Sequence, residues 1–198
     1  MLSKKQQILK RSFDIFFAIV GMVFLCIPIG ILILLATIST KSFGLFSQSR
    51  IGQFGKSFSI YKIRSMVKNS ATNTITIKND ERITTFGRFI RKYNLDELPQ
   101  IFNVLTGNMS FVGPRPDVKG YADELKGDDR ILLSVKPGIT GPATLKFKHE
   151  EELLANKENP KKYNDEILWK EKVTMNKKYV QNWSFINDLK YILKTFGI

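Results

Sequence analysis

The stretch "IFFAIVGMVFLCIPIGILILLATIST", residues 15–40, organises the whole chain. It holds 26 residues without one charged side chain, and basic residues flank it on both sides. Such a run belongs in a lipid bilayer. It is long for the apolar part of a signal peptide, and no small-x-small cleavage site follows it, so we set a cleaved leader aside.

Pro28 lies near the middle of this run and raises a choice between two arrangements. A straight helix of this length would measure about 39 Å against a hydrocarbon core of about 30 Å, which fits a single span. However, Pro28 deletes a helical hydrogen bond and favours a kink, with Gly30 nearby. Both flanks are basic, and positive flanks prefer the cytoplasmic side. We therefore favour a re-entrant helix–break–helix over a straight span.

The length of 198 residues allows one domain and a smaller unit. We expect residues 1–41 to form the basic flank and the proline-broken membrane helix, and residues 42–198 to form a domain at the cytoplasmic membrane face. The predicted fold class is α+β and mainly helical, with amphipathic surface helices and a short β-hairpin.

The charge balance indicates what the protein binds. The net charge is +13, and residues 1–64 hold nine basic residues and one acid. This part of the chain is suited to a polyanion, which leaves nucleic acid, anionic lipid and a phosphorylated substrate as alternatives. Cys26 is the only cysteine and His149 the only histidine, which excludes a disulfide framework and an ordinary zinc site. We expect Cys26 to be inert and His149 to lie at the surface.

Basic side chains recur in the next segments. "RIGQFGKSFSIYKIRSM", residues 50–66, reads as a short strand or hairpin, and alternation places Lys62 and Arg64 on one side of it. Ordinary solvated charge is the alternative interpretation. A short helical pattern then carries three further arginines: Arg82, Arg88 and Arg91.

Asp96 and Glu97 stand side by side in "LDELPQIFNVL", residues 95–105, which has helical spacing. Pro99 fits only the first turn of such a helix, so both acids lie at its N-terminal start. There the helix dipole favours ionised carboxylates, and the pair could serve only to cap and charge the helix.

Two proline- and glycine-rich loops follow. In "GPRPD" the prolines on either side of Arg115 hold its guanidinium in a preset position, which suits a bidentate grip on phosphate. "KPGITGPATL", residues 136–145, reads as a second loop. The last stretch, residues 184–198, reads as a helix capped by Ser184 that is either buried in the core or lies on a membrane surface.

Several uncommon motifs in one order carry a resemblance to a known family. These are "KRSFD" before the apolar run, "QSRIGQFGKSFSIYKIRSM", "ERITTFGRFIRKYNLDELPQIFNVLTGNMSFVGPRPD" and "KPGITG". Together they closely resemble the bacterial monotopic phosphoglycosyl transferases. The resemblance implies transfer of a sugar 1-phosphate from a UDP-sugar to undecaprenyl phosphate, with Mg²⁺ and release of UMP, at the cytoplasmic face of the bacterial inner membrane. It also implies a re-entrant helix and a small family member that lacks the extra N-terminal membrane helices of the long ones.

The resemblance assigns roles to particular residues. It implies that Asp96 is the nucleophile and a neighbour of Mg²⁺, and that Glu97 completes the catalytic dyad. The remaining matched positions are expected to contact phosphate or nucleotide: Lys62, Arg64, Arg82, Arg88 and Arg115. Two departures stand out, because Ile27 precedes Pro28 where family members often have serine, and "GPATLKFKHEE" leaves the sugar specificity open.

Phosphoryl transfer needs positioning and charge neutralisation, which a basic cluster, a metal and one carboxylate can supply. Two other classes of function compete with it. One is a membrane-tethered nucleic-acid-binding protein, which no recognisable motif supports, so we expect no nucleic acid partner. The other is a catalytically silent anchor for glycan assembly, against which the intact dyad argues. The expected partners are membrane lipids and the two substrates, and downstream glycosyltransferases are further candidates.

Overall fold

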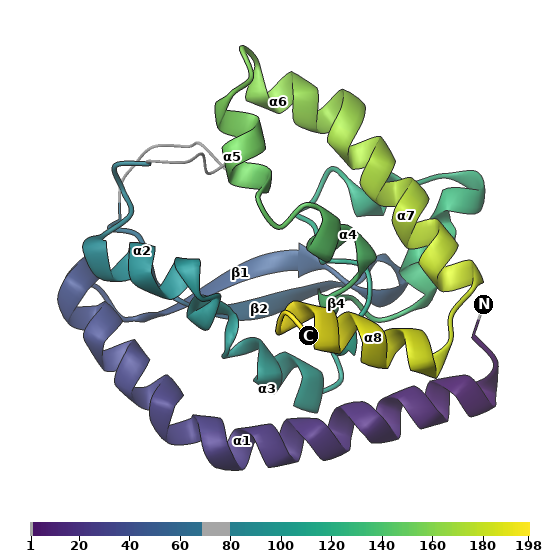
Figure 1. Ribbon diagram of the computed structural model, residues 1–198, viewed down its shortest axis with the longest axis horizontal. Helices are drawn as coiled ribbons and strands as arrows, with labels where there is room; N and C mark the ends of the chain where they lie inside the picture. Colours follow the sequence, from purple (N-terminus) through teal and green to yellow (C-terminus); the bar gives the residue numbers. More distant parts are fainter. Residues whose placement is uncertain (1, 69–79) are drawn as a thin grey trace.

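A computed structural model describes residues 2–68 and 80–198 of the chain. It begins with α1 (Lys4–Thr40), a helix of 37 residues that follows one side of the molecule (Figure 1). A capping box starts this helix: the Ser3 hydroxyl accepts a hydrogen bond from the Gln6 amide, and the Gln6 side chain accepts one from the Ser3 amide.

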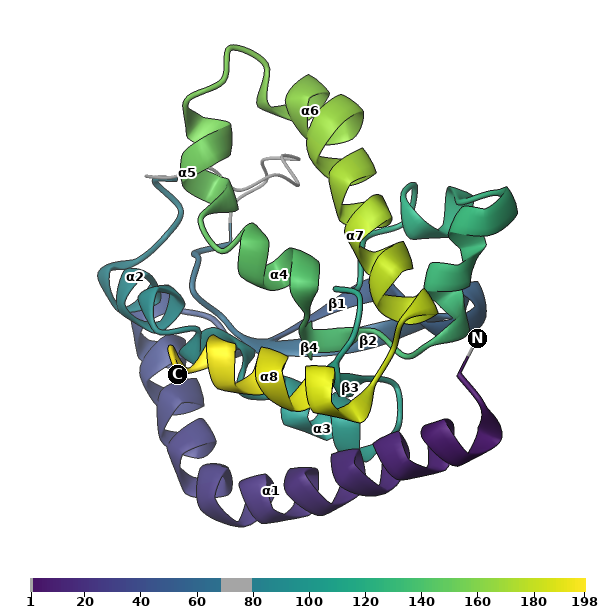
Figure 2. The same cartoon turned by 45° about the vertical axis from the view of Figure 1, so that its right-hand side comes forward.

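α1 changes direction along its length (Figure 2). Pro28 lies inside the helix and is exposed, whereas the adjacent Ile29 is buried. The structure corrects the predicted break, because one helix continues through Pro28 and bends. The proline removes one hydrogen bond, which bends a helix without ending it when both arms pack on the same body.

The apolar surface of α1 remains largely uncovered. Only 11% of its most apolar 18-residue stretch is buried, and Phe24 in that region is 73% exposed. A core helix of a soluble protein would be mostly covered by its own chain. By length and composition, α1 is a helix that could cross a membrane.

The predicted hairpin is confirmed. β1 (Leu45–Ile51) pairs antiparallel with β2 (Ser57–Ile63) through the turn η1 (Gln53–Gly55). The expectation that Arg64 continues the strand beside Lys62 is wrong, since β2 ends at Ile63. The buried Ile60 and Ile63 are three residues apart, so the simple alternation of buried and exposed positions stops there.

The predicted 95–105 helix is divided in two. α2 (Thr85–Lys92) leads through Asn94, which has a left-handed φ of 53°, into a short 3₁₀ turn, η2 (Leu95–Glu97). α3 (Gln100–Leu105) starts directly after Pro99. Asp96 and Glu97 therefore precede α3, as expected, but they occupy a tighter turn of their own.

The predicted loop at residues 136–145 is wrong, because it contains two regular elements. β4 (Gly138–Thr140) pairs parallel with β3 (Ser110–Val112), and α4 (Pro142–Lys146) follows. Close backbone approach explains the glycines, since a Cβ on Gly138 would lie 2.1 Å from the amide nitrogen of Gly113. In the sequence, the segment between β3 and β4 contains η3 (Ala122–Glu124) and η4 (Gly127–Ser134).

The C-terminal third is helical. It comprises α5 (Glu150–Ala155), α6 (Pro160–Tyr163), the π-helix η5 (Asn164–Leu168), α7 (Trp169–Gln181) and α8 (Phe185–Thr195). α8 and α3 lie toward α1, while α6 lies at the far end of the molecule (Figures 1 and 2). Ser184 caps α8 as predicted, and Phe185 faces the core while Phe196 stays exposed.

The core forms where α1 meets the domain. One buried cluster joins α1, β2 and α3 through Ala18, Ile60 and Ile101. A second joins α1, β2 and α2 through Ala36, Ile63 and Ile90. These contacts hold the hairpin and the turn η2 against α1. In the part of the chain that the structure describes, the fold is mainly helical with two small sheets, which agrees with the predicted class.

Candidate active site

Glu97 is the centre of a charged network. Its Oε1 lies 2.8 Å from Nζ of Lys62, and Arg115 contacts both carboxylate oxygens, with Nη1 3.3 Å from Oε2. The side chain of Glu97 is 14% exposed. Burial acts to raise the pKa of Glu97, but Arg115 and Lys62 outweigh it and hold that pKa below its ordinary value. Glu97 is therefore a fixed anion that orients two cations.

Asp96 has a different environment although it is the next residue. It is 8% exposed, and its carboxylate makes no hydrogen bond with any residue that the structure describes. Burial raises the pKa of Asp96, Glu97 adds to the rise, and Lys62 opposes it. A buried carboxylate that no donor occupies is available for a ligand or for reaction.

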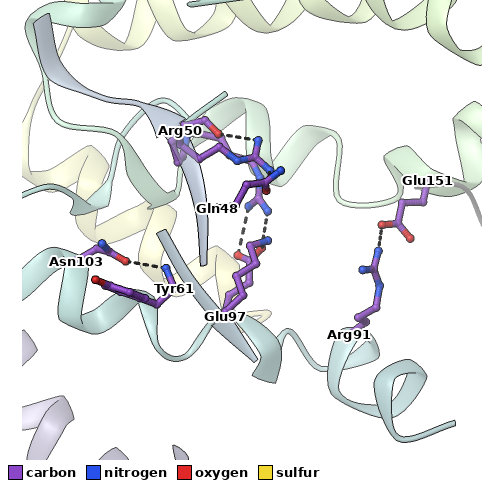
Figure 3. Close-up of polar contacts among 10 residues, drawn as sticks. Gln48, Arg50, Tyr61, Arg91, Glu97, Asn103 and Glu151 are labelled. Carbon is purple, nitrogen blue, oxygen red and sulfur yellow. Dashed lines mark hydrogen bonds and ion pairs between the residues drawn. The ribbon is translucent and has the colours of Figure 1, made fainter. Parts of the chain in front are cut away.

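Asn103 of α3 joins the dyad to the hairpin. Its amide nitrogen donates to the Ser59 carbonyl at 2.7 Å, and its Oδ1 accepts from the Tyr61 amide at 3.2 Å. Figure 3 shows Asn103 beside Tyr61, next to the Glu97 network. This buried side chain fixes α3 against β2, so Lys62 and Glu97 meet from two separate elements.

Sequence reasoning missed two charged residues beside the site, one arginine and one aspartate. Arg50 at the end of β1 donates from Nη1 to the Pro116 carbonyl at 3.4 Å and from Nη2 to Gln48 at 2.7 Å (Figure 3). Burial lowers the pKa of Arg50, and the nearby Arg115 adds to that effect. Asp117 follows the proline-flanked Arg115. Burial raises the pKa of Asp117 to about 6, although Lys172, Arg50 and Arg115 act to lower it. Arg50 and Asp117 both lie inside the motifs quoted in the sequence analysis, and this position is the sequence signal that could have identified them.

A separate ion pair connects α2 to α5. Arg91 Nη2 contacts the carboxylate of Glu151, and Figure 3 shows the two side chains meeting across the space between their helices. Arg91 also lies close enough to Asp96 to lower the pKa of that carboxyl. The α5 segment is thereby held on the side of the site where α2 lies.

The structure brings Lys62 and Arg115 to Glu97, but three other predicted phosphate-binding residues make different described contacts. Arg64 Nε donates to the Phe43 carbonyl at 2.8 Å, and its guanidinium lies over the Phe46 ring. Arg82 forms a bidentate pair with Asp80. Arg88 lies 3.5 Å from the Thr85 hydroxyl on the surface of α2. The three roles stay predictions without geometric support at the dyad.

Comparison with known proteins decides the family. The family model described as "Bacterial sugar transferase" matches residues 5–198, which is nearly the whole chain. The chain belongs to the bacterial sugar transferase family. The resemblance inferred from the motifs is confirmed, and this sugar transferase is a member of an enzyme family.

Several relatives resemble the chain over nearly its whole length. It is 35% identical to an undecaprenyl-phosphate galactose phosphotransferase of Salmonella typhimurium, over 98% of this chain and 41% of the relative. It is 32% identical to the UDP-glucose:undecaprenyl-phosphate glucose-1-phosphate transferase of Escherichia coli, over 98% and 40%. It is 36% identical to the uncharacterized sugar transferase EpsL of Bacillus subtilis, over 95% and 85%. The chain thus spans about two-fifths of the length of the first two relatives.

The predicted Mg²⁺ can be tested against the donor set of this sugar transferase. Within residues 2–68 and 80–198, no group of three or more His, Cys, Asp or Glu side chains could hold a metal ion. Mg²⁺ in phosphoryl-transfer sites needs fewer, since one or two carboxylates bind it together with substrate phosphates and water. Asp96 offers such a carboxylate, whereas Lys62 and Arg115 occupy Glu97. The residues fit Mg²⁺ held by Asp96 and the substrate.

Proposed function

We propose that this protein transfers a sugar 1-phosphate from a UDP-sugar to undecaprenyl phosphate and releases UMP, as the first membrane step of bacterial glycan assembly. The observation that carries the proposal is the buried, unoccupied carboxylate of Asp96 beside the network of Lys62, Glu97 and Arg115. The names of the Salmonella and Escherichia coli relatives support the same class of substrates.

Asp96 acts as the nucleophile in the proposed reaction. Its carboxylate oxygen attacks the β-phosphorus of the UDP-sugar, and the bond from that phosphorus to the bridging oxygen breaks, so that UMP leaves. A phosphate oxygen of undecaprenyl phosphate then attacks the same phosphorus and releases Asp96 with the lipid-linked product. The pKa of Asp96 is raised by burial, which indicates a desolvated and therefore more reactive oxygen.

The cations hold the diphosphate in place. Arg115 engages Glu97 through two nitrogens and keeps its other N–H groups for phosphate oxygens. Lys62 adds a point charge, and Arg50 supports the loop that carries Arg115. Mg²⁺, when bound by Asp96 and the diphosphate, would neutralise charge on the leaving UMP. These groups supply positioning and charge stabilisation, which dominate phosphoryl transfer.

The surface of the molecule supports a proposal for the membrane arrangement. Apolar side chains are exposed along α1 and also on α2, α3 and α8, for example Phe89, Phe102 and Ile186. These helices lie toward α1 in both views (Figures 1 and 2). We propose that α1 is re-entrant, that both of its ends face the cytoplasm, and that residues 42–198 form the catalytic domain on that face. The polyprenyl tail then reaches the dyad without leaving its leaflet.

The decisive experiment seeks the covalent intermediate. Wild-type protein given Mg²⁺ and a panel of UDP-sugars without lipid acceptor should gain the mass of a sugar phosphate on the peptide carrying Asp96 and release one equivalent of UMP. Asp96→Asn should give neither product, because the amide cannot attack phosphorus.

Glu97→Gln is the comparison variant, since it keeps the shape of the side chain but weakens its hold on Arg115 and Lys62. We expect a partial loss of turnover with the adduct still on Asp96. Membrane association of both variants should match wild type. Full turnover by Asp96→Asn, or rapid-quench samples without an adduct during lipid-dependent turnover, would overturn the proposed mechanism.

A further inference from the structure

Asn176 is a buried polar residue that the proposed mechanism does not use. It lies on α7, it is 6% exposed, and its Oδ1 has no hydrogen-bond partner among the residues that the structure describes. An unpaired buried amide oxygen costs free energy, so a well-packed protein normally supplies it with a donor.

A small cavity lies beside this side chain, beneath the loop that carries Arg115. Its volume is about 20 Å³, and its polar lining consists of Asn176, Arg115 and Asp117 among apolar neighbours such as Leu132 and Val135. A cavity of about 10 to 15 Å³ already holds one water molecule, provided that polar partners are present. The space is too small for a sugar or a nucleotide base.

Asp117 presents a second acceptor to the same cavity. Its carboxylate receives no hydrogen bond within residues 2–68 and 80–198, although Arg50, Arg115 and Lys172 act on it at longer range. An amide oxygen and a carboxylate cannot bond to each other directly when both only accept. A molecule with two O–H donors placed between them would satisfy both.

The backbone around this point is already fixed. The Gly113 amide donates to Thr140 at 2.9 Å, the Pro114 carbonyl accepts from Gly138 at 2.8 Å, and the Asp117 carbonyl accepts from Ile51 at 2.8 Å. These bonds hold the ends of the loop but not its underside.

We propose that one water molecule donates hydrogen bonds to Asn176 Oδ1 and to the Asp117 carboxylate, and that Asn176 is thereby a positioning residue for the loop that carries Arg115. The kinetic consequence rests on the proposed function, because it concerns how Arg115 meets the donor diphosphate. The water itself does not depend on that function.

The direct test is a structure of the full-length protein in lipid nanodiscs or detergent at a resolution that shows ordered water. We expect a water oxygen at about 2.7 to 3.2 Å from both Asn176 Oδ1 and Asp117 in wild type. Asn176→Leu, which has a similar volume but no acceptor, should lose this water. An empty cavity, or a direct bond from the Asn176 amide nitrogen to Asp117, would overturn the proposal.

Kinetics separate positioning from general destabilisation. Asn176→Leu should raise the KM for the UDP-sugar five- to tenfold while the KM for undecaprenyl phosphate stays within twofold of wild type. Asn176→Asp keeps an acceptor and should recover the UDP-sugar KM to within threefold at pH 6. Asn182→Leu, the same change at the exposed C-terminal end of α7, is the control and should resemble wild type.

Three other outcomes would separate failure of the positioning role from failure of the proposed function. Equal changes in both KM values, or a wild-type donor KM in Asn176→Leu, would contradict the positioning role. If wild type releases no UMP from any UDP-sugar, the proposed function fails, and the structural test still decides whether the water is present.

Discussion

Adjacent carboxylates in this protein have opposite environments. Glu97 is held by Lys62 and Arg115, and its pKa falls, whereas Asp96 is buried without a donor, and its pKa rises. The 3₁₀ turn explains the difference, because successive side chains of a tight turn point in different directions. The helix-dipole argument from sequence expected two similar ionised groups. One acid has become a structural anion, and the other is left available for chemistry.

Arg115→Lys tests whether the planar guanidinium matters. Lysine keeps the charge but cannot contact both oxygens of Glu97, so the loop and the phosphate grip should loosen. We expect kcat/KM to fall at least tenfold, which corresponds to about 1.4 kcal/mol or more. Arg130→Lys, at an exposed arginine on η4, is the matched control. Near wild-type turnover of Arg115→Lys would reduce this residue to a general positive charge.

The raised pKa of Asp117 predicts how the stability of the protein depends on pH. Its pKa is raised to about 6 from 3.8 by burial, with Glu150 adding to the rise and Lys172, Arg50 and Arg115 opposing it. Between about pH 4 and 6 the native state therefore holds a proton that the unfolded chain has released. Stability should fall as pH rises through this window.

Asp117→Asn should remove that part of the pH dependence. Measured by thermal unfolding in detergent, the free energy of unfolding of wild type relative to the variant should drop by roughly 2 kcal/mol from pH 4 to pH 7. Asp128→Asn, at an exposed carboxylate on η4, serves as the control. A constant difference between wild type and Asp117→Asn would contradict the raised pKa.

At the scale of secondary structure, local signals predicted some elements and missed others. The glycine turn and the alternation around Phe58 and Ile60 sufficed for the β-hairpin, and Ser184 sufficed for the start of α8. The parallel pair β3 and β4 was missed because each strand has three residues and the partners are far apart in sequence. Strands this short carry no periodic signal.

Local sequence patterns likewise predicted some residues of the candidate active site and missed others. The acids and Arg115 stand in conspicuous local patterns, so Asp96, Glu97, Lys62 and Arg115 could be proposed from sequence and family resemblance. Arg50 and Asp117 acquire their roles only when β1 lies against the loop after β3, a long-range contact. Arg64 was misplaced because the strand ends one residue earlier than its alternation indicated.

Pro28 governs the shape of α1 and provides a test of topology. In a Cys26→Ala background, Lys5→Cys and Ser47→Cys should both resist an impermeant thiol reagent in intact cells. Pro28→Ala restores the missing N–H and lowers the cost of a straight helix by roughly 3 kcal/mol, so a fraction of molecules should expose one of the two sites.

Gly30→Ala is the control for this change, because a Cβ at that position meets nothing within 4 Å. It should leave both cysteines protected. Labelling of either site from outside in the Pro28-containing protein would contradict the re-entrant arrangement and return α1 to a single span.

At the scale of the whole molecule, the N-terminal arm of α1 is fastened by three charged residues. Lys10 pairs with Asp188 of α8 at 2.6 Å, Arg11 donates to the last carbonyls of α3, and Asp14 accepts from Ser110 and Phe111 in β3. Asp188 also accepts hydrogen bonds from Tyr179 and Trp183. α1 is thereby fixed in register with the domain that carries the dyad.

Lys10→Met should show how much this pairing contributes. Removing one partner leaves a buried carboxylate without its cation, which costs roughly 3 to 5 kcal/mol. Thermal unfolding followed by Trp183 fluorescence measures the loss, and the Lys10→Met, Asp188→Asn double variant should lose less than the sum of the single changes. Lys177→Met breaks a partly exposed pair with Asp129 and should cost much less stability than Lys10→Met. Additive losses would show that Lys10 and Asp188 do not interact.

The Lys10–Asp188 pair also sets an order of events during biosynthesis. The two residues are 178 positions apart, which corresponds to roughly 10 to 35 seconds of translation. α1 is made before α8, so Lys10 stays hydrated and without its carboxylate partner during this interval. Its carboxylate partner, Asp188, becomes available only when α8 has been made. A nascent chain stalled before α8 would therefore hold α1 without this ion pair, and the synthesis of α8 would then fix α1 to the domain.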